Sequence, residues 1–213
     1  MPGHAITRAG LILAGYLLGS IPFGLILGKL FGGTDVRGSG SGNIGAANVA
    51  RVVGAGAGVL TLLLDAAKGS LAVWLAERLA NASAAWMMAA GAAALLGHCF
   101  PVWLRFKGGK GVATAAGIYA VICPLAALFA IVLFLFVVAF WRYVSLGSIA
   151  AVAAMPLLLY FFWAPPHALP LSVTIDTFLI AVVIVWKHDA NLQRLWKGDE
   201  PRFVFRRKDG ADK

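Results

Sequence analysis

Residues 106–114 read Phe-Lys-Gly-Gly-Lys-Gly-Val-Ala-Thr and bring two lysines and three glycines together between long uncharged segments. A glycine-rich loop leaves backbone N–H groups open, and lysines beside it add positive charge, so this stretch is suited to bind an anion, above all a phosphate. The alternative is a cytoplasmic turn whose lysines only set the orientation of the chain in a membrane. The residues that could contact the anion are Lys107, Gly108, Gly109, Lys110, Gly111 and Thr114.

A second candidate anion site lies at residues 39–51, which read Ser-Gly-Ser-Gly-Asn-Ile-Gly-Ala-Ala-Asn-Val-Ala-Arg. Ser41 or Asn43 fits the N-cap of a following helix, and the free N–H groups at such a helix start attract anions. Asn48 and Arg51 are three residues apart and share a face of that helix. The alternative is a flexible loop with an ordinary cap. The candidates here are Ser41, Gly42, Asn43, Gly45, Asn48 and Arg51.

A third polar group follows the last apolar segment, where His188, Asn191 and Arg194 recur every three residues ahead of Glu200. This spacing predicts one polar face of a helix. The alternative is a solvated face next to a membrane that binds anionic lipid. The short sequence Trp141-Arg142-Tyr143, in contrast, is interpreted only as an interfacial anchor.

Asp65 and Lys68 are the strongest physical anomaly, because they lie three residues apart inside an apolar segment. An unpaired charge at the centre of a bilayer costs at least ~3 kcal/mol, so their presence needs a reason. They either form an ion pair in which each charge compensates the other in the core, or they line a water-filled site. We favour an ion pair that supports the structure of the site. His98, at the end of another apolar segment, is interpreted as a packed or interfacial histidine.

The segments that must position these residues are apolar enough for a bilayer. Of 213 residues, 61% are hydrophobic and 13% charged, and the charged share is about half of that in soluble domains. We therefore expect an all-α integral membrane protein, with a short interfacial helix near residues 45–53. The predicted single domain, residues 1–213, has seven transmembrane helices at about 9–31, 59–79, 84–104, 112–123, 125–140, 146–163 and 171–186, and a cytoplasmic tail at 187–213.

The positions of the cations predict the orientation of this bundle. With seven spans, 15 of the 18 Lys and Arg residues fall on the side of residues 105–111, Arg8 and Arg78 fall on the other side, and Lys68 lies within a span. The positive-inside rule then places the N-terminus outside and the C-terminus in the cytoplasm, with all three polar motifs on the cytoplasmic face. Because the net charge of +9 marks one side of a membrane, it does not indicate nucleic-acid binding. The four histidines are scattered, so no metal or other cofactor is expected.

Together, these motifs resemble the bacterial membrane acyl-phosphate:glycerol-3-phosphate acyltransferases (the PlsY family). Two departures stand out: Ala47 where the family usually has Thr, which removes a hydroxyl contact, and Leu192 where Ile is usual. One block alone is a weak match, but five in register are specific. The blocks that carry the resemblance, in the family's order and at matching spacings, are residues 19–24, 41–51, 62–69, 97–114 and 188–200.

The resemblance implies a seven-span enzyme of the bacterial cytoplasmic (inner) membrane, with its active site facing the cytoplasm. It implies transfer of an acyl chain from acyl phosphate to the 1-hydroxyl of glycerol 3-phosphate, giving lysophosphatidic acid and phosphate in the first acylation of phospholipid synthesis. The partners it implies are the two substrates, membrane lipids and a soluble acyl-phosphate synthase. Because the donor is already activated, no covalent enzyme intermediate is needed. The family is thought to let a substrate phosphate take the hydroxyl proton, and His188 is the alternative base.

The resemblance and the residue chemistry together suggest roles. Ser41, Asn43 and Arg51 hold a phosphate and the reacting carbonyl, residues 107–110 hold the acceptor phosphate, and His188 and Asn191 orient the acceptor hydroxyl. The expected catalytic residues are Ser41, Arg51, Lys110, His188 and Asn191; the substrate-binding residues are Gly42, Asn43, Gly45, Asn48, Lys107, Gly108, Gly109, Gly111 and Thr114; the structural supports are Asp65, Lys68, Arg194 and Glu200.

Two other classes of protein compete with this interpretation. A transporter of anions or organophosphates needs polar residues that thread the whole membrane. The outer halves of the expected spans 3 to 7 carry a single charged residue, Asp176, so no such path is evident. A purely structural membrane subunit leaves the Asp65–Lys68 pair and the glycine-rich motifs unexplained.

Overall fold

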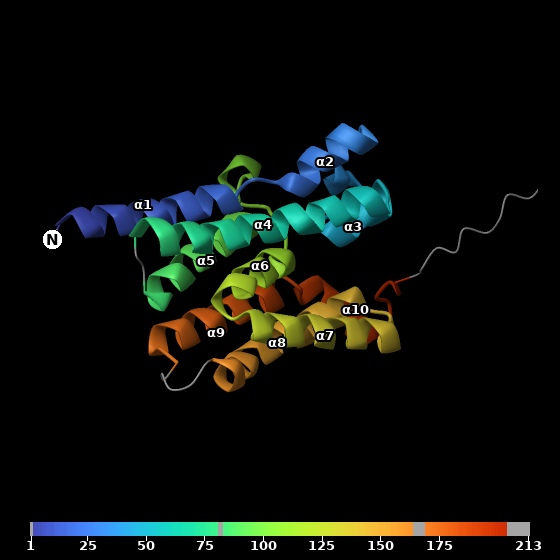
Figure 1. Cartoon of the computed structure of the whole chain (residues 1–213). Coiled ribbons are helices and arrows are strands. Elements are labelled where there is room, and N and C mark those ends of the chain that lie inside the picture. The colour runs from blue at the N-terminus through green and yellow to red at the C-terminus, as the bar shows by residue number, and fades with distance from the viewer. Residues whose placement is uncertain (1, 81–82, 164–168, 204–213) are drawn as a thin grey trace, which may run out of the picture.

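The computed structural model describes residues 2–80, 83–163 and 169–203, which form a helical bundle (Figure 1). Most of the apolar sequence becomes α-helix, as expected for segments that must satisfy their backbone groups internally in lipid. The α-helices are α1 Pro2–Gly19, α2 Phe23–Gly32, α3 Ala46–Val52, α4 Ala55–Ala80, α5 Ala84–Cys99, α6 Val112–Ile122, α7 Pro124–Trp141, α8 Val144–Phe162, α9 Leu171–Trp186 and α10 Asp189–Lys197, with short 3-10 turns η1 Val36–Gly38 and η2 Val102–Leu104.

The bundle contains five segments long and apolar enough to cross a membrane, or six if α9 and α10, which meet at a 55° bend, count as one span. The helix at the expected fourth span, α6, has only 11 residues, about 16 Å at 1.5 Å per residue, against a hydrocarbon core of about 30 Å. The all-helical membrane architecture is therefore confirmed, whereas the count of seven spans stays a prediction. The five segments are Arg8–Gly32, Ala55–Leu79, Ala84–Leu104, Pro124–Trp141 and Val144–Phe162.

The helices differ from the expected elements at the polar segments that connect them. The first expected span is broken at residues 20–22 into α1 and α2, because Pro22 lacks the N–H needed to continue α1. A short helix is present where one was expected near residues 45–53, as α3, and its interfacial position stays a prediction. The expected polar tail contains the amphipathic helix α10.

The helices form two outer layers with α5 and α6 between them. Figure 1 shows α1, α2 and α4 on one side and α7, α8 and α9 on the other. Between layers, α4 packs mainly against α6 and α1 against α5, whereas α7 packs against α8 within one outer layer. The start of α1 lies at one end of the bundle, and α3 and α10 lie toward the other end, where the polar motifs meet.

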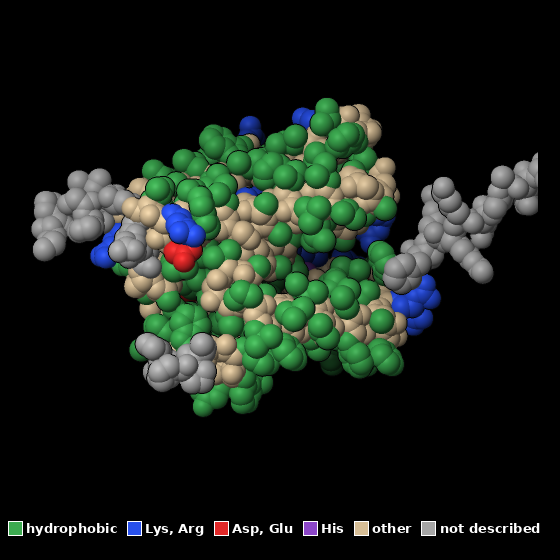
Figure 2. All heavy atoms as spheres, in the orientation of Figure 1, with side chains coloured by type: hydrophobic (Ala, Val, Ile, Leu, Met, Phe, Trp, Pro, Cys, Tyr) green, Lys and Arg blue, Asp and Glu red, His purple; other side chains and the backbone are tan. Residues whose placement is uncertain are grey.

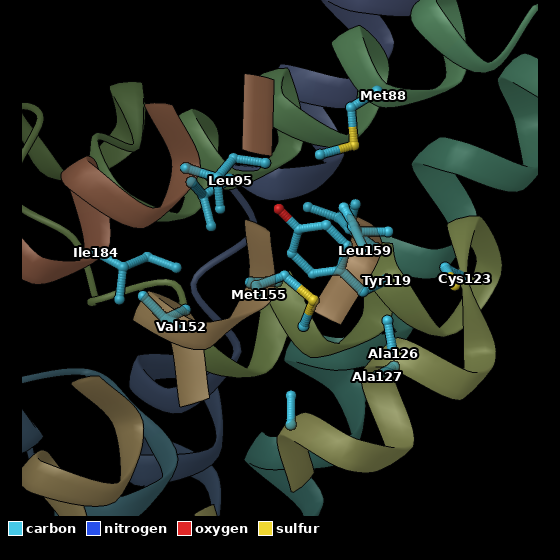
Figure 3. Packing of buried hydrophobic residues seen from close by; sticks show 14 of the residues in the cluster. Met88, Leu95, Tyr119, Cys123, Ala126, Ala127, Val152, Met155, Leu159 and Ile184 are labelled. Carbon is cyan, nitrogen blue, oxygen red and sulfur yellow. The ribbon is translucent and has the colours of Figure 1, made fainter. Parts of the chain in front are cut away.

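The interior combines bulky apolar side chains with very close helix contacts. Buried side chains gather around Tyr119, among them Leu95, Met155 and Leu159 (Figure 3). Glycines bring α6 and α4 together: a Cβ at Gly117 would overlap the carbonyl oxygen of Ala66. Small residues commonly allow membrane helices to approach in this way.

Replacing Gly117 with Ala should therefore force α4 and α6 apart. Overpacking of this kind costs about 1–3 kcal/mol, so we expect the midpoint of thermal unfolding in detergent to fall by several degrees. The control is Gly10→Ala on α1, where a Cβ has no neighbour within 4 Å and the midpoint should hold or rise slightly. Equal midpoints for the two variants would contradict the close α4–α6 contact.

Candidate active site

The three polar motifs meet around one cavity of about 210 Å³ between α3–α4 and α7–α8. Figure 2 shows it as a hollow between the two outer layers, with Lys, Arg and His side chains at its bottom. The volume lies below the roughly 300–1,000 Å³ of sites for drug-sized molecules and suits a small polar headgroup. The predicted site residues that line it are Ser41, Asn43, Gly45, Asn48, Arg51, Asp65, Lys110, Gly111, His188, Asn191, Arg194 and Glu200.

Lys110, Asn191 and Glu200 form the central hydrogen-bonded chain of the cavity. The Lys110 ammonium donates to Asn191 Oδ1, and Asn191 Nδ2 donates to Glu200 Oε1 over 2.6 Å. Asn191 comes from the polar face of α10, whose amphipathic pattern directs it inward. The expected face of His188, Asn191 and Arg194 therefore exists, and it faces the cavity.

Glu200 is the carboxylate that holds this chain together. It also accepts from Ser145 Oγ over 2.6 Å and from Arg194 Nε over 2.8 Å. Burial acts to raise the pKa of Glu200, but the hydrogen bonds from Ser145, Asn191 and Arg194 outweigh it and lower the pKa. The group is thus a fixed negative charge.

Lys110 itself lies in an environment that disfavours its charged form. Burial of the ammonium group lowers the pKa of Lys110 to about 8. Glu200 acts in the opposite direction, and the cations Arg194, Lys187 and Arg51 add to the lowering. A bound anion would supply the counter-charge that this ammonium lacks.

His188 has one fixed ring nitrogen. Its Nδ1 lies 2.8 Å from the carbonyl oxygen of Ile184, and because a carbonyl can only accept, Nδ1 carries the hydrogen. In the neutral ring, Nε2 is then the acceptor. His188 lines the cavity with this arrangement, which suits it to receive a hydrogen bond from a hydroxyl.

The first inner loop is shaped by Asn48. Its Nδ2 donates to the carbonyl oxygens of Val36, Ser39 and Asn43, and its Oδ1 accepts from the N–H of Ser41. The amide is 2% exposed. It borders the cavity, and its hydrogen bonds fix the shape of the loop there.

The predicted cap of the helix after this loop is wrong. Gly45, not Ser41 or Asn43, occupies the N-cap of α3. Asn43 Oδ1 instead accepts from the Gly45 N–H, which forms a tight turn just before the helix. Ser41, Asn43 and Arg51 nevertheless line the same cavity.

The glycine–lysine loop differs most from its prediction, because the N–H groups of Gly108 and Gly109 are not free. Gly108 N donates to the carbonyl oxygen of Cys99 over 3.2 Å and Gly109 N to that of His98 over 3.0 Å. The glycines therefore seat the loop on the end of α5, and only Lys110 and Gly111 of the predicted contacts reach the cavity. The predicted substrate-binding residues outside its lining are Gly42, Lys107, Gly108, Gly109 and Thr114.

Asp65 and Lys68 form the expected ion pair, with Lys68 Nζ 2.8 Å from Asp65 Oδ1 and each side chain 3% exposed. Lys68 Nζ also donates to the Ile21 carbonyl oxygen over 2.9 Å, at the break between α1 and α2. The pair thus stabilises the broken first segment, and Asp65 borders the cavity. The predicted supporting role agrees with these contacts.

Sequence reasoning missed Ser145 and His98 as cavity residues. Ser145 lies 55 residues from its partner Glu200, just after the turn that had been interpreted as an anchor. No spacing rule links such distant residues, although a serine in the first turn of an apolar helix, three residues after an interfacial Arg, is a weak signal. Within residues 2–80, 83–163 and 169–203, no group of three or more His, Cys, Asp or Glu side chains could hold a metal ion.

The fold and the site together define an integral membrane protein with a cavity lined by the cations Arg51, Lys110 and Arg194. The family model described as glycerol-3-phosphate acyltransferase matches residues 9–198. The chain belongs to the glycerol-3-phosphate acyltransferase family and is an acyltransferase, and this assignment disfavours the transporter alternative.

Individual relatives agree with this family. The glycerol-3-phosphate acyltransferase of Syntrophotalea carbinolica is 50% identical over 193 residues, covering 91% of this chain and 96% of the relative. That of Trichlorobacter lovleyi is 52% identical over 194 residues, covering 90% and 95%. The crystal structure of PlsY (YgiH), an integral membrane glycerol 3-phosphate acyltransferase, in its glycerol 3-phosphate form is 39% identical with a TM-score of 0.86, covering 93% of this chain and 96% of that one. The lysophosphatidic acid form gives a TM-score of 0.83 with the same identity and coverage.

Glu200→Gln tests the central chain of the cavity. The variant keeps the shape of the side chain but removes the charge that accepts from Ser145, Asn191 and Arg194, so Asn191 and Lys110 should lose their fixed positions. We expect acyltransferase kcat/KM to fall by about 10–100-fold, in line with breaking a partly buried hydrogen-bonded charge. The control Asp199→Asn removes a neighbouring exposed charge and should change kcat/KM less than twofold. Full activity of Glu200→Gln would rule out this role.

Proposed function

We propose that this chain transfers an acyl group from acyl phosphate to the 1-hydroxyl of glycerol 3-phosphate, giving lysophosphatidic acid and phosphate. One observation carries the proposal. Among the cavity cations, Arg194 pairs with Glu200, whereas Arg51 and Lys110 have no carboxylate partner within 4.0 Å among the described residues. Two uncompensated cations match two phosphate-bearing substrates. The similar crystal structures in glycerol 3-phosphate and lysophosphatidic acid forms support the acceptor and the product.

The acyl chain would lie along the apolar side of the same cavity. Leu62 of α4 and Phe134 of α7 line it between the two outer layers, and the lipid-facing surfaces of both helices carry exposed apolar side chains. An acyl chain could thus reach the polar end from the bilayer with its carbonyl at the cations. Burial of each CH₂ group contributes about 0.8 kcal/mol.

The chemistry needs no covalent enzyme intermediate. The acceptor oxygen attacks the acyl carbon, the C–O bond to phosphate breaks with its electron pair leaving on the phosphate oxygen, and the hydroxyl proton passes to that phosphate. Arg51 and Ser41 would stabilise the phosphate and the developing oxyanion, while Lys110 would hold the acceptor phosphate. His188, through Nε2, and Asn191 would orient the acceptor hydroxyl, with His188 the alternative base.

The finer topology belongs to the same proposal. Seven spans, an outer N-terminus and a cytoplasmic C-terminus place the cavity at the cytoplasmic face of the bacterial inner membrane. The one-sided distribution of Lys and Arg supports this orientation. Glycerol 3-phosphate and a donor made by a soluble acyl-phosphate synthase would both arrive from the cytoplasm.

The first test compares cations inside and outside the cavity. In proteoliposomes supplied with acyl phosphate and glycerol 3-phosphate, Arg51→Ala and Lys110→Ala should each lower kcat/KM by about 10²–10³-fold, as for loss of a group that stabilises transition-state charge. The matched control is Lys107→Ala, because Lys107 is exposed and lies outside the cavity lining. Its kcat/KM should stay within about twofold. Acyl-CoA is the control donor, and absence of product from acyl phosphate with the unmodified protein would refute the proposed reaction.

The second test uses the lowered pKa of Lys110. The group faces Glu200, Arg194, Lys187 and Arg51, and in the free protein it loses its charge as pH rises through about 8. Because a bound phosphate favours the charged form, the KM for glycerol 3-phosphate should be lowest below pH 8 and rise up to roughly tenfold per pH unit above it. Lys110→Arg, which stays charged, should lose this rise even if its activity is lower throughout. A KM that is flat from pH 7 to 9.5 in the unmodified protein would contradict the role of Lys110.

A further inference from the structure

His98 lies where the buried charges of α4 meet the glycine–lysine loop. Its side chain is 4% exposed, and its Nδ1 lies 3.5 Å from Asp65 Oδ1. The same Asp65 oxygen is paired with Lys68, which is tied to the Ile21 carbonyl. The imidazole at the end of α5 therefore lies against a buried, paired charge cluster.

The loop before Lys110 rests directly on this histidine. Gly109 N donates to the His98 carbonyl oxygen and Gly108 N to that of Cys99. A Cβ at Gly109 would overlap the imidazole at Nε2 and Cε1. The ring edge thus covers Gly109, and only glycine fits between the ring and the loop.

The contacts of the His98 ring with Asp65 and Gly109 also indicate its role. Although His98 borders the cavity, its Nδ1 faces Asp65 and its Nε2 faces Gly109. Nδ1 is thus turned toward the buried ion pair and Nε2 lies against the loop, an arrangement that suits the ring to position Gly109.

We propose that His98 and Asp65 are positioning residues for Lys110: Asp65 holds the imidazole, the imidazole seats Gly109, and the seat sets where the Lys110 side chain leaves the backbone. The inference rests on the proposed function in that Lys110 holds the acceptor phosphate. A lysine has a long flexible side chain, so its ammonium is placed accurately only if its backbone is fixed. A misplacement of about 1 Å in such a group can cost about 10²-fold in rate.

The test is a pair of single variants and their combination. Gly109→Ala adds a methyl group against the ring and should raise the KM for glycerol 3-phosphate at least tenfold. His98→Ala removes the seat and should raise it about threefold to tenfold. In the double variant the new methyl group has the space of the missing ring, so its KM should be lower than that of Gly109→Ala alone. The KM for acyl phosphate should stay within twofold in all three, because Arg51 is not displaced.

A merely structural role predicts a different pattern. It would lower the unfolding midpoint and the active fraction with both KM values unchanged, and the two single effects would multiply in the double variant. Either result overturns the proposal. The control is Gly56→Ala on α4, where a Cβ has no neighbour within 4 Å, and neither KM should change.

A second readout does not depend on turnover and so separates this inference from the proposed reaction. The rate at which acetic anhydride acetylates Lys110, relative to the exposed Lys107 in the same protein, is measured by peptide mass spectrometry. The ratio should rise several-fold in Gly109→Ala and His98→Ala and fall back in the double variant. An unchanged ratio in both single variants refutes the seat, whether or not acyl phosphate is a donor. If the ratios change as expected but the protein makes no product from acyl phosphate, the positioning of Lys110 by His98 is supported and only the proposed function is refuted.

Discussion

The site depends on a single carboxylate placed among cations. Glu200 joins helices that are not neighbours in the chain, through Ser145 on α8 and through Asn191 and Arg194 on α10. Through Asn191 it also reaches Lys110, on the loop before α6. Without this charge, Arg51, Lys110 and Arg194 would line one cavity with no carboxylate paired to any of them, which is costly at low dielectric. The carboxylate therefore stabilises the cavity while leaving Arg51 and Lys110 available for anions.

The membrane imposes a second constraint on the same loops. Backbone groups near the hydrocarbon must find partners in the protein, and the N–H groups of Gly108 and Gly109 find them in the last carbonyls of α5. Two of the three glycines that were expected to bind an anion through their backbone thus close the end of a helix instead. The loop brings Lys110 and Gly111 to the cavity and holds the lysine at a fixed place.

The sequence predicts the class of fold and most of the cavity, and it fails where the outcome depends on contacts between distant residues. Uncharged runs identify the helices, and the three-residue spacing of His188, Asn191 and Arg194 predicts a face that does line the cavity. The break at Pro22 was missed, because membrane helices also tolerate proline without breaking. Which N–H groups are free could not be predicted, since the seat of Gly109 comes from His98, and the role of Ser145 depends on Glu200, 55 residues away. The number of spans also stays open to experiment, because α6 is too short to assign from its length alone.

Lys110 lies between two buried charge clusters, one of which fixes the geometry of its loop while the other sets the charge around its ammonium group. Toward the interior, its loop rests on the cluster of Asp65, Lys68 and His98, which is internally paired and fixes geometry. Toward the cavity, its ammonium reaches Glu200 only through Asn191, and burial lowers the pKa of Lys110 despite the opposing effect of Glu200. A protein selected for stability alone would pair the lysine directly with a carboxylate, which would neutralise it before a substrate arrived. Placing an amide between them keeps the lysine ordered but electrostatically unsatisfied, and a phosphate dianion can supply the missing charge.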